Sequence, residues 1–215
     1  LATAGWPDWR RALRLAHEGT DEKARDRLAY DELLANSLAL LLVKAEGRRR
    51  RGQALVGDGA LRARLHLPFA LTGAQVRSIG EIEGDMAQEA PMLRLLQGDV
   101  GAGKTVVALN AMLIAVEAGK QAALLAPTEI LARQHFETLR RMLGPTGIDI
   151  ALLTGRAKGR EREGLLIGLL DGSIPLLVGT HAIFQDSVAD RDLGLVVIDE
   201  QHRFGVEQRK ALGAK

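Results

Sequence analysis

Short apolar runs alternate with longer amphipathic segments over most of the chain after residue 90. Mostly apolar runs of five or six residues predict buried strands, and the segments between them carry apolar residues at helical spacing. The predicted strands cover residues 92–97, 121–126, 149–153, 174–179 and 193–198. The predicted helices cover residues 106–116, 127–143 and 156–170. Near-continuous apolar strands that alternate with helices are typical of an α/β fold, a parallel sheet covered by helices on both faces.

The first 67 residues follow a different pattern. Leucines recur at helical spacing after Thr20, a plausible helix cap, and predict one long amphipathic helix. This helix ends in Arg48–Arg51, which either complement the helix dipole or contact nucleic-acid phosphates. The composition of residues 53–67 is typical of a linker, which ends at Pro68. We therefore place a domain boundary between residues 67 and 68, and we expect a further helix from about residue 73 to 86.

Composition narrows the class of protein. Hydrophobic residues make up 47% and charged residues 26%, which indicates a globular chain, and only 3% aromatics implies an aliphatic core. The absence of cysteine excludes disulfides, Cys-based zinc sites and thiol catalysis. No apolar run reaches the ~18 residues that span a membrane, and no signal peptide opens the sequence. We expect a cytoplasmic protein with no membrane partner.

Two smaller features leave alternatives open. Trp6 and Trp9 either stack on bases or anchor the terminal segment, and the general burial of tryptophan favours the anchor. The net charge is only +2, so any basic surface must come from the distribution of charges. The basic run at residues 155–160 either touches nucleic acid or is a solvated loop.

One stretch fits the phosphate-binding pattern G-x-x-x-x-G-K-[ST] between a predicted strand and a predicted helix. Its glycines let the backbone curl so that N–H groups point at a polyphosphate, and the following helix adds its positive end. The lysine would reach the β- and γ-phosphates, and the threonine hydroxyl would ligate Mg²⁺. A glycine-rich turn is the alternative, but the setting favours phosphate binding. The residues are Gly98, Asp99, Val100, Gly101, Ala102, Gly103, Lys104 and Thr105.

A second candidate site follows the last apolar run. Asp199 and Glu200 come directly after the predicted strand 193–198, at the edge where ligands bind in parallel sheets. Beside a P-loop, Asp199 would hold Mg²⁺ together with Thr105, and Glu200 would orient and deprotonate the attacking water. A solvated acidic strand end is the alternative. The sequence therefore predicts a site for a polyphosphate and Mg²⁺.

The D-E-Q-H box at residues 199–202, together with the P-loop, resembles the first motor domain of superfamily 2 helicases. This resemblance implies a RecA-like P-loop NTPase domain over residues 68–215, preceded by a helical linker region over residues 1–67. Longer segments resemble the RecG family, bacterial helicases of branched DNA, at residues 27–36, 67–75, 96–105, 126–135, 179–182 and 199–206. The transcription-repair coupling translocases share two of these segments, but their box is usually D-E-E-H.

The resemblance also implies roles for single residues. Phe69 and Gln75 would form an adenine-sensing motif, although a glutamine here is by default solvated. The implied catalytic residues are Lys104, Asp199, Glu200, Gln201 and His202, the last two coupling nucleotide state to a second motor domain. The residues implied to face the DNA backbone are Pro127, Thr128, Gly179, Thr180 and His181. Thr128 is also a plausible helix cap, and the two roles can coexist because a helix N-terminus itself binds phosphate.

The implied activity is that of an ATP-dependent translocase that remodels branched DNA by fork regression and Holliday junction migration, in recombination and repair. A wedge domain is expected upstream of Leu1, and a second RecA-like domain with an arginine finger beyond Lys215. Without that arginine, the piece alone is expected to bind Mg-ATP but hydrolyse it slowly. The alternatives are a transcription-repair coupling translocase and a nucleotide-dependent binding switch without motor activity.

Overall fold

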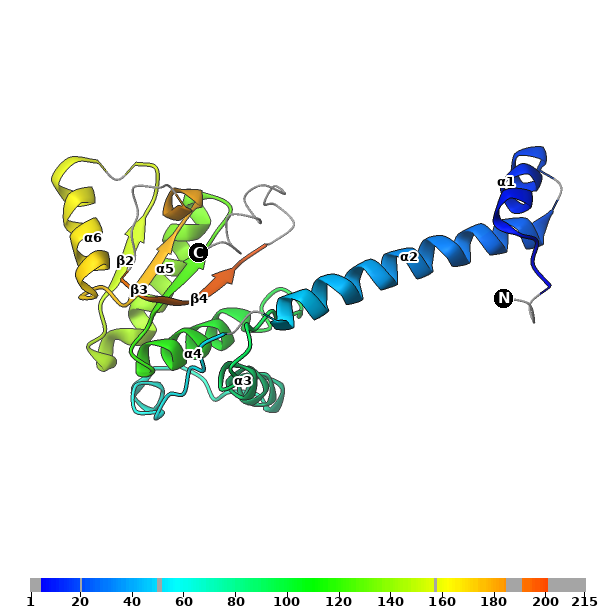
Figure 1. Ribbon diagram of the computed structural model, residues 1–215. Coiled ribbons are helices and arrows are strands. Elements are labelled where there is room, and N and C mark those ends of the chain that lie inside the picture. The colour runs from blue at the N-terminus through cyan, green and yellow to red at the C-terminus, as the bar shows by residue number, and fades with distance from the viewer. Residues whose placement is uncertain (1–4, 20, 50–51, 157, 185–190, 201–215) are drawn as a thin grey trace. The chain divides into compact units, whose positions relative to one another are not determined.

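A computed structural model describes residues 5–19, 21–49, 52–156, 158–184 and 191–200 (Figure 1). The chain divides into two compact units, residues 1–51 and residues 52–215, and each is described by itself.

The described residues of the first unit form the helices α1 (Trp9–Glu18) and α2 (Glu22–Arg49). Asp8 caps α1, and the Trp6 ring lies 5.1 Å from the Tyr30 ring of α2, so Trp6 anchors the terminal segment. The long predicted helix is confirmed as α2, whereas its predicted cap Thr20 lies outside the described residues. No described helix is both long enough and apolar enough to span a bilayer.

The second unit is built on a parallel sheet with the strand order β2-β3-β1-β4. The strands are β1 (Gln121–Leu125), β2 (Ile150–Leu153), β3 (Leu176–Gly179) and β4 (Leu193–Ile198). The three strand pairings among the described residues are parallel, so the carboxyl ends of these strands share one edge. The helices are α3 (Gly73–Met86), α4 (Lys104–Glu117), α5 (Glu129–Leu143) and α6 (Gly159–Asp171).

Alternate residues of β1 belong to two different hydrophobic clusters. Leu124 packs with side chains of α4 and α5 such as Leu113 and Leu139. Leu125 packs on the other face with Leu169 of α6. The predicted parallel sheet with helices on both faces is therefore confirmed, and every residue of β1 is buried.

The predicted strand over residues 92–97 is wrong for this structure, which assigns these residues neither helix nor strand. Arg94 interrupts the apolar run, and its guanidinium binds Glu81 at 2.6 Å and Asp85 at 2.7 Å, both on α3. Leu93 is fully exposed, whereas Met92 and Leu96 pack against the core. The segment is therefore attached to α3 through a charged residue that a buried strand would not tolerate.

Residues 52–67 belong to the α/β unit, so the division falls after residue 51 instead of at the predicted position after residue 67. Leu55 is buried in the core, and its N–H donates to the carbonyl of Met86 at 2.7 Å. The carboxylate of Glu117, at the end of α4, accepts hydrogen bonds from the backbone N–H groups of Gly59, Leu61 and Arg62 and from the Arg62 side chain. We call this arrangement the Glu117 clasp. It explains why the apparent linker packs against the domain.

Candidate nucleotide-binding site

The P-loop forms a turn that leads directly into α4. Gly101 has φ of 84° and Gly103 has φ of 78°, both in the left-handed region that glycine adopts without strain. A Cβ at Gly103 would also lie 2.4 Å from the side-chain nitrogen of Gln75. Lys104 is the first residue of α4, so the loop residues stand at the positive end of the helix.

The ammonium of Lys104 is folded back onto the loop. Its Nζ donates to the carbonyl oxygen of Gly98 at 2.6 Å and to that of Asp99 at 3.0 Å. Residues 98–102 are exposed. Phosphate oxygens carry negative charge and bind an ammonium more strongly than neutral carbonyls do, so a polyphosphate in this loop would compete for Lys104.

Gln75 connects the start of α3 to the P-loop. The Thr72 hydroxyl accepts from the N–H of Gln75, and the Gln75 side-chain oxygen accepts from the N–H of Thr72, forming a capping box. The Gln75 side-chain nitrogen donates to the carbonyl of Ala102 at 2.9 Å. Both the oxygen and the nitrogen of the Gln75 side chain therefore form hydrogen bonds within the protein. This differs from the solvated glutamine that the sequence suggested by default. Phe69 is half exposed at 46%.

Asp199 follows β4 at the carboxyl edge of the sheet. Its N–H donates to the carbonyl of Leu125 at 2.8 Å, which extends the pairing with β1 by one residue. Its Oδ2 lies 2.8 Å from Nε2 of His135 on α5. Glu200 has φ of 51°, a conformation uncommon for residues other than glycine and frequent at functional sites. Gln201 and His202 lie outside the described residues.

The two segments predicted to face DNA lie at the carboxyl ends of neighbouring strands. Thr128 follows β1 and caps α5, accepting from the N–H of Leu131 at 3.3 Å, so the predicted cap is confirmed. Gly179 ends β3, where a Cβ would lie 2.1 Å from the carbonyl oxygen of Leu153. Thr180 is 3% exposed, and its hydroxyl is buried. A phosphate could not reach that hydroxyl in this conformation, and for His181 only the backbone is described.

The sequence of this chain matches a known protein family. The family model described as DEAD/DEAH box helicase matches residues 72–214. The chain belongs to the DEAD/DEAH box helicase family. The helicase-family match includes the P-loop and the acidic pair after β4.

The predicted resemblance to RecG is confirmed. The ATP-dependent DNA helicase RecG of Escherichia coli O127:H6 is 50% identical over 194 residues, which cover 89% of this chain and 28% of that protein. RecG of Acidithiobacillus ferridurans is 47% identical over 215 residues, 96% of this chain and 31% of that protein. The chain thus spans less than a third of these relatives.

Solved structures agree with the helicase assignment. A structure of RecG bound to a three-way DNA junction matches with a TM-score of 0.79 and 47% identity, over 86% of this chain and 26% of that one. A hypothetical ATP-dependent RNA helicase from Sulfolobus tokodaii matches with a TM-score of 0.51 and 18% identity, over 68% of this chain and 43% of that one. The second match supports the fold alone.

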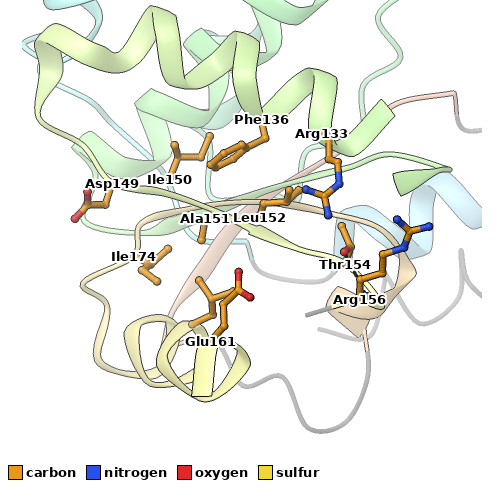
Figure 2. A pocket seen from close by; sticks show the side chains of 11 residues that line it. Arg133, Phe136, Asp149, Ile150, Ala151, Leu152, Thr154, Arg156, Glu161 and Ile174 are labelled. Carbon is orange, nitrogen blue, oxygen red and sulfur yellow. Dashed lines mark hydrogen bonds between the residues drawn. The ribbon is translucent and has the colours of Figure 1, made fainter. Parts of the chain in front are cut away.

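A hollow of about 540 Å³ lies along β2, away from the P-loop of this helicase-family domain. Figure 2 shows Arg133 and Phe136 of α5 on one side of β2 and Glu161 of α6 on the other. Among the described residues β2 pairs only with β3, whereas Asp199 follows β4 at the opposite end of the strand order. At the rim, Arg156 of the basic loop pairs with Glu129 at 3.0 Å and stays 80% exposed.

Mg²⁺ binds proteins through one or two carboxylates together with substrate phosphates and waters. Thr105 supplies a hydroxyl next to Lys104, and Asp199 supplies a carboxylate. The described part of the chain contains no group of three or more metal-ligating side chains.

His135 is the residue at this site to which the sequence assigned no function. The predicted helix already included His135, which lies seven residues, or about two helical turns, after the Thr128 cap. What the sequence could not supply was the neighbour, since Asp199 lies 64 residues further along the chain and reaches His135 only because β4 pairs with β1.

Proposed function

We propose that residues 52–215 are the nucleotide-binding motor domain of an ATP-dependent helicase that remodels branched DNA. The observation that carries this proposal is the P-loop at the start of α4, in the same parallel sheet unit as Asp199 and Glu200 after β4. The 50% identity with an ATP-dependent DNA helicase RecG supports the substrate class.

In this proposal Lys104 binds the β- and γ-phosphates of ATP, and the hydroxyl of Thr105 and the carboxylate of Asp199 hold Mg²⁺. When bound, the cation neutralises charge that develops on the transferred phosphoryl group. Glu200 orients the attacking water and accepts its proton. Phe69 and Gln75 meet the adenine, and Gln75 then exchanges its contact with Ala102 for one with the base.

The proposed DNA contacts lie at the carboxyl ends of β1 and β3. Thr128 and the first N–H groups of α5 present a helix N-terminus to a phosphate, with Pro127 beside it. Gly179, Thr180 and His181 would contribute through their backbone, because the Thr180 hydroxyl is buried. The solved RecG structure bound to a three-way DNA junction supports branched DNA as the partner.

The 215-residue chain alone is proposed to bind Mg-ATP and to hydrolyse it slowly. Motor turnover would require a second RecA-like domain that supplies an arginine to the transition state, and such an arginine contributes roughly 10³-fold or more in related NTPases. The share of the RecG relatives that the chain covers, 28–31%, supports this view. A wedge domain would complete the machine that separates strands.

The test is ATP turnover by the full-length protein with a four-way DNA junction. Glu200→Gln keeps the size of the side chain and removes the general base, so nucleotide binding should persist while turnover falls by about 10²-fold or more. Glu137→Gln, an exposed position on α5, is the matched control and should turn over normally. Equal turnover by Glu200→Gln and the control would contradict the proposed role.

A further inference from the structure

The pair formed by His135 and Asp199 joins α5 to the proposed metal ligand. Nε2 of His135 lies 2.8 Å from Oδ2 of Asp199, and the two side chains are 17% and 29% exposed. We propose that His135 is a positioning residue, which holds the carboxylate of Asp199 in the orientation that binds Mg-nucleotide. This inference rests on the proposed function and adds to it a residue that acts through Asp199.

The chemistry of the contact fixes its direction. An ionised carboxylate can only accept hydrogen bonds, so Nε2 of His135 is the donor. A carboxylate has two oxygens, so the bond to Oδ2 leaves Oδ1 to face a cation or a cation-bound water. Groups that hydrogen-bond to a metal ligand fix its orientation, and their loss weakens metal binding.

The backbone geometry explains why Asp199 needs such a partner. The N–H of Asp199 is held by Leu125, so the main chain is fixed at the end of β4, while the next residue, Glu200, has a positive φ. The regular strand therefore ends at the residue that carries the ligand. The carboxylate still rotates about its side-chain bonds, and the contact with His135 restricts that rotation.

His135 lies on a packed face of α5. Ala132 and Leu139, the residues three before and four after it on α5, are both fully buried in the core. These neighbours lie on the same side of the helix as His135, because residues three and four apart share a face. The imidazole is therefore presented from a packed helix face and not from a loop.

The test measures Mg²⁺-dependent nucleotide binding in the full-length protein, using a fluorescent ADP analogue at varied free Mg²⁺. His135→Leu keeps a side chain that packs but removes the donor, and should raise the half-saturating Mg²⁺ concentration about tenfold. Nucleotide affinity in excess chelator should stay unchanged. His135→Gln, whose amide nitrogen can donate from a similar reach, should stay close to the unmodified protein.

Two controls separate positioning from general stabilisation. Gln134→Leu replaces a neighbouring exposed polar side chain of α5 and should leave the Mg²⁺ dependence unchanged. In an Asp199→Ala background, His135→Leu should add no further loss, because Asp199→Ala already removes the carboxylate that His135 contacts. Additive losses in the double variant, or an unchanged Mg²⁺ dependence in His135→Leu, would overturn the inference. Failure of the unmodified protein to bind nucleotide would instead overturn the proposed function on which it rests.

Discussion

α4 begins with the cation Lys104 and ends with the anion Glu117, and the surroundings of these two charges differ. The ammonium of Lys104 donates to two carbonyls of its own exposed loop. The Glu117 side chain is 1% exposed and accepts from three backbone N–H groups and the Arg62 guanidinium. A ligand can therefore form hydrogen bonds with polar groups at the start of α4. The polar groups at the end of α4 are already hydrogen-bonded within the fold.

This difference separates function from stability along a single helix. The hydrogen bonds of Lys104 can be exchanged for bonds to phosphate without unfolding anything, because its present partners are solvent-accessible. The Glu117 clasp cannot be exchanged, because it holds residues 59–62 against the end of α4. Substitutions at the two ends should consequently change different measured quantities.

The largest expected effect is on turnover. Lys104→Ala removes the cation that would face the β- and γ-phosphates, so ATP turnover should fall by roughly 10²–10³-fold, the usual cost of losing one preorganised donor. Amide exchange of β1, which reports core opening, should match the unmodified protein. Lys23→Ala, an exposed lysine of α2, serves as the control. A turnover loss that accompanies faster exchange in β1 would contradict the separation.

The next largest effect is on stability. Glu117→Ala leaves Arg62 and three N–H groups without their acceptor, and should lower the free energy of unfolding by about 3 kcal/mol. Faster amide exchange in β1 and in α4 measures this loss. Nucleotide affinity under conditions where the domain stays folded should be unchanged, and a specific loss of affinity would break the comparison.

Glu83→Gln tests the weaker ion pair that Arg62 forms with Glu83. Glu83 binds Arg62 at 2.9 Å but its side chain is 43% exposed, so the charge it loses is largely solvated. Burial lowers the pKa of the Arg62 guanidinium, but the Glu83 hydrogen bond and the charges of Glu117 and Glu83 more than compensate, so the pKa is raised overall. Arg62 thus stays charged, and Glu83→Gln should cost less than about 1 kcal/mol in the same exchange experiment.

The smallest effect is expected at the cap of α3. Thr72→Ala removes one side of this exposed capping box and should cost about 0.5 kcal/mol, measured by amide exchange in the first turn of α3. Because Gln75 also contacts Ala102, a small rise in the dissociation constant for nucleotide should accompany it. A stability loss with no change at all in nucleotide affinity would show that the cap and the P-loop are independent.

Features set by local chemistry were predictable from the sequence. The P-loop was recognisable because its glycines and lysine have fixed spacing, and β1 and β4 because their runs contain only apolar and small residues apart from the first position of β1. The Thr128 cap was predictable because hydrogen bonds over three residues depend on sequence alone. The position of Asp199 at the sheet edge followed from the parallel arrangement.

Features set by distant partners were not predictable. The Glu117 clasp joins Glu117 to backbone groups that lie 55 to 58 positions earlier in the chain, and neither segment alone indicates the other. The mostly apolar run at residues 92–97 resembled a strand. Its Arg94 binds acidic residues of α3, and the run itself gives no sign of these partners. The contact of His135 with Asp199 required the strand order, and strand order depends on packing between elements far apart in the chain.

The central claim is that this domain drives a machine acting on branched DNA. The most direct measurement is the rate of ATP turnover by the full-length protein with a four-way junction, compared with a linear duplex of the same base composition at fixed salt. We predict a rate several-fold higher with the junction, and Lys104→Ala should lower the rate by roughly 10²–10³-fold. Equal rates on the two DNAs, with nucleotide still bound, would contradict the claim and leave only the nucleotide site.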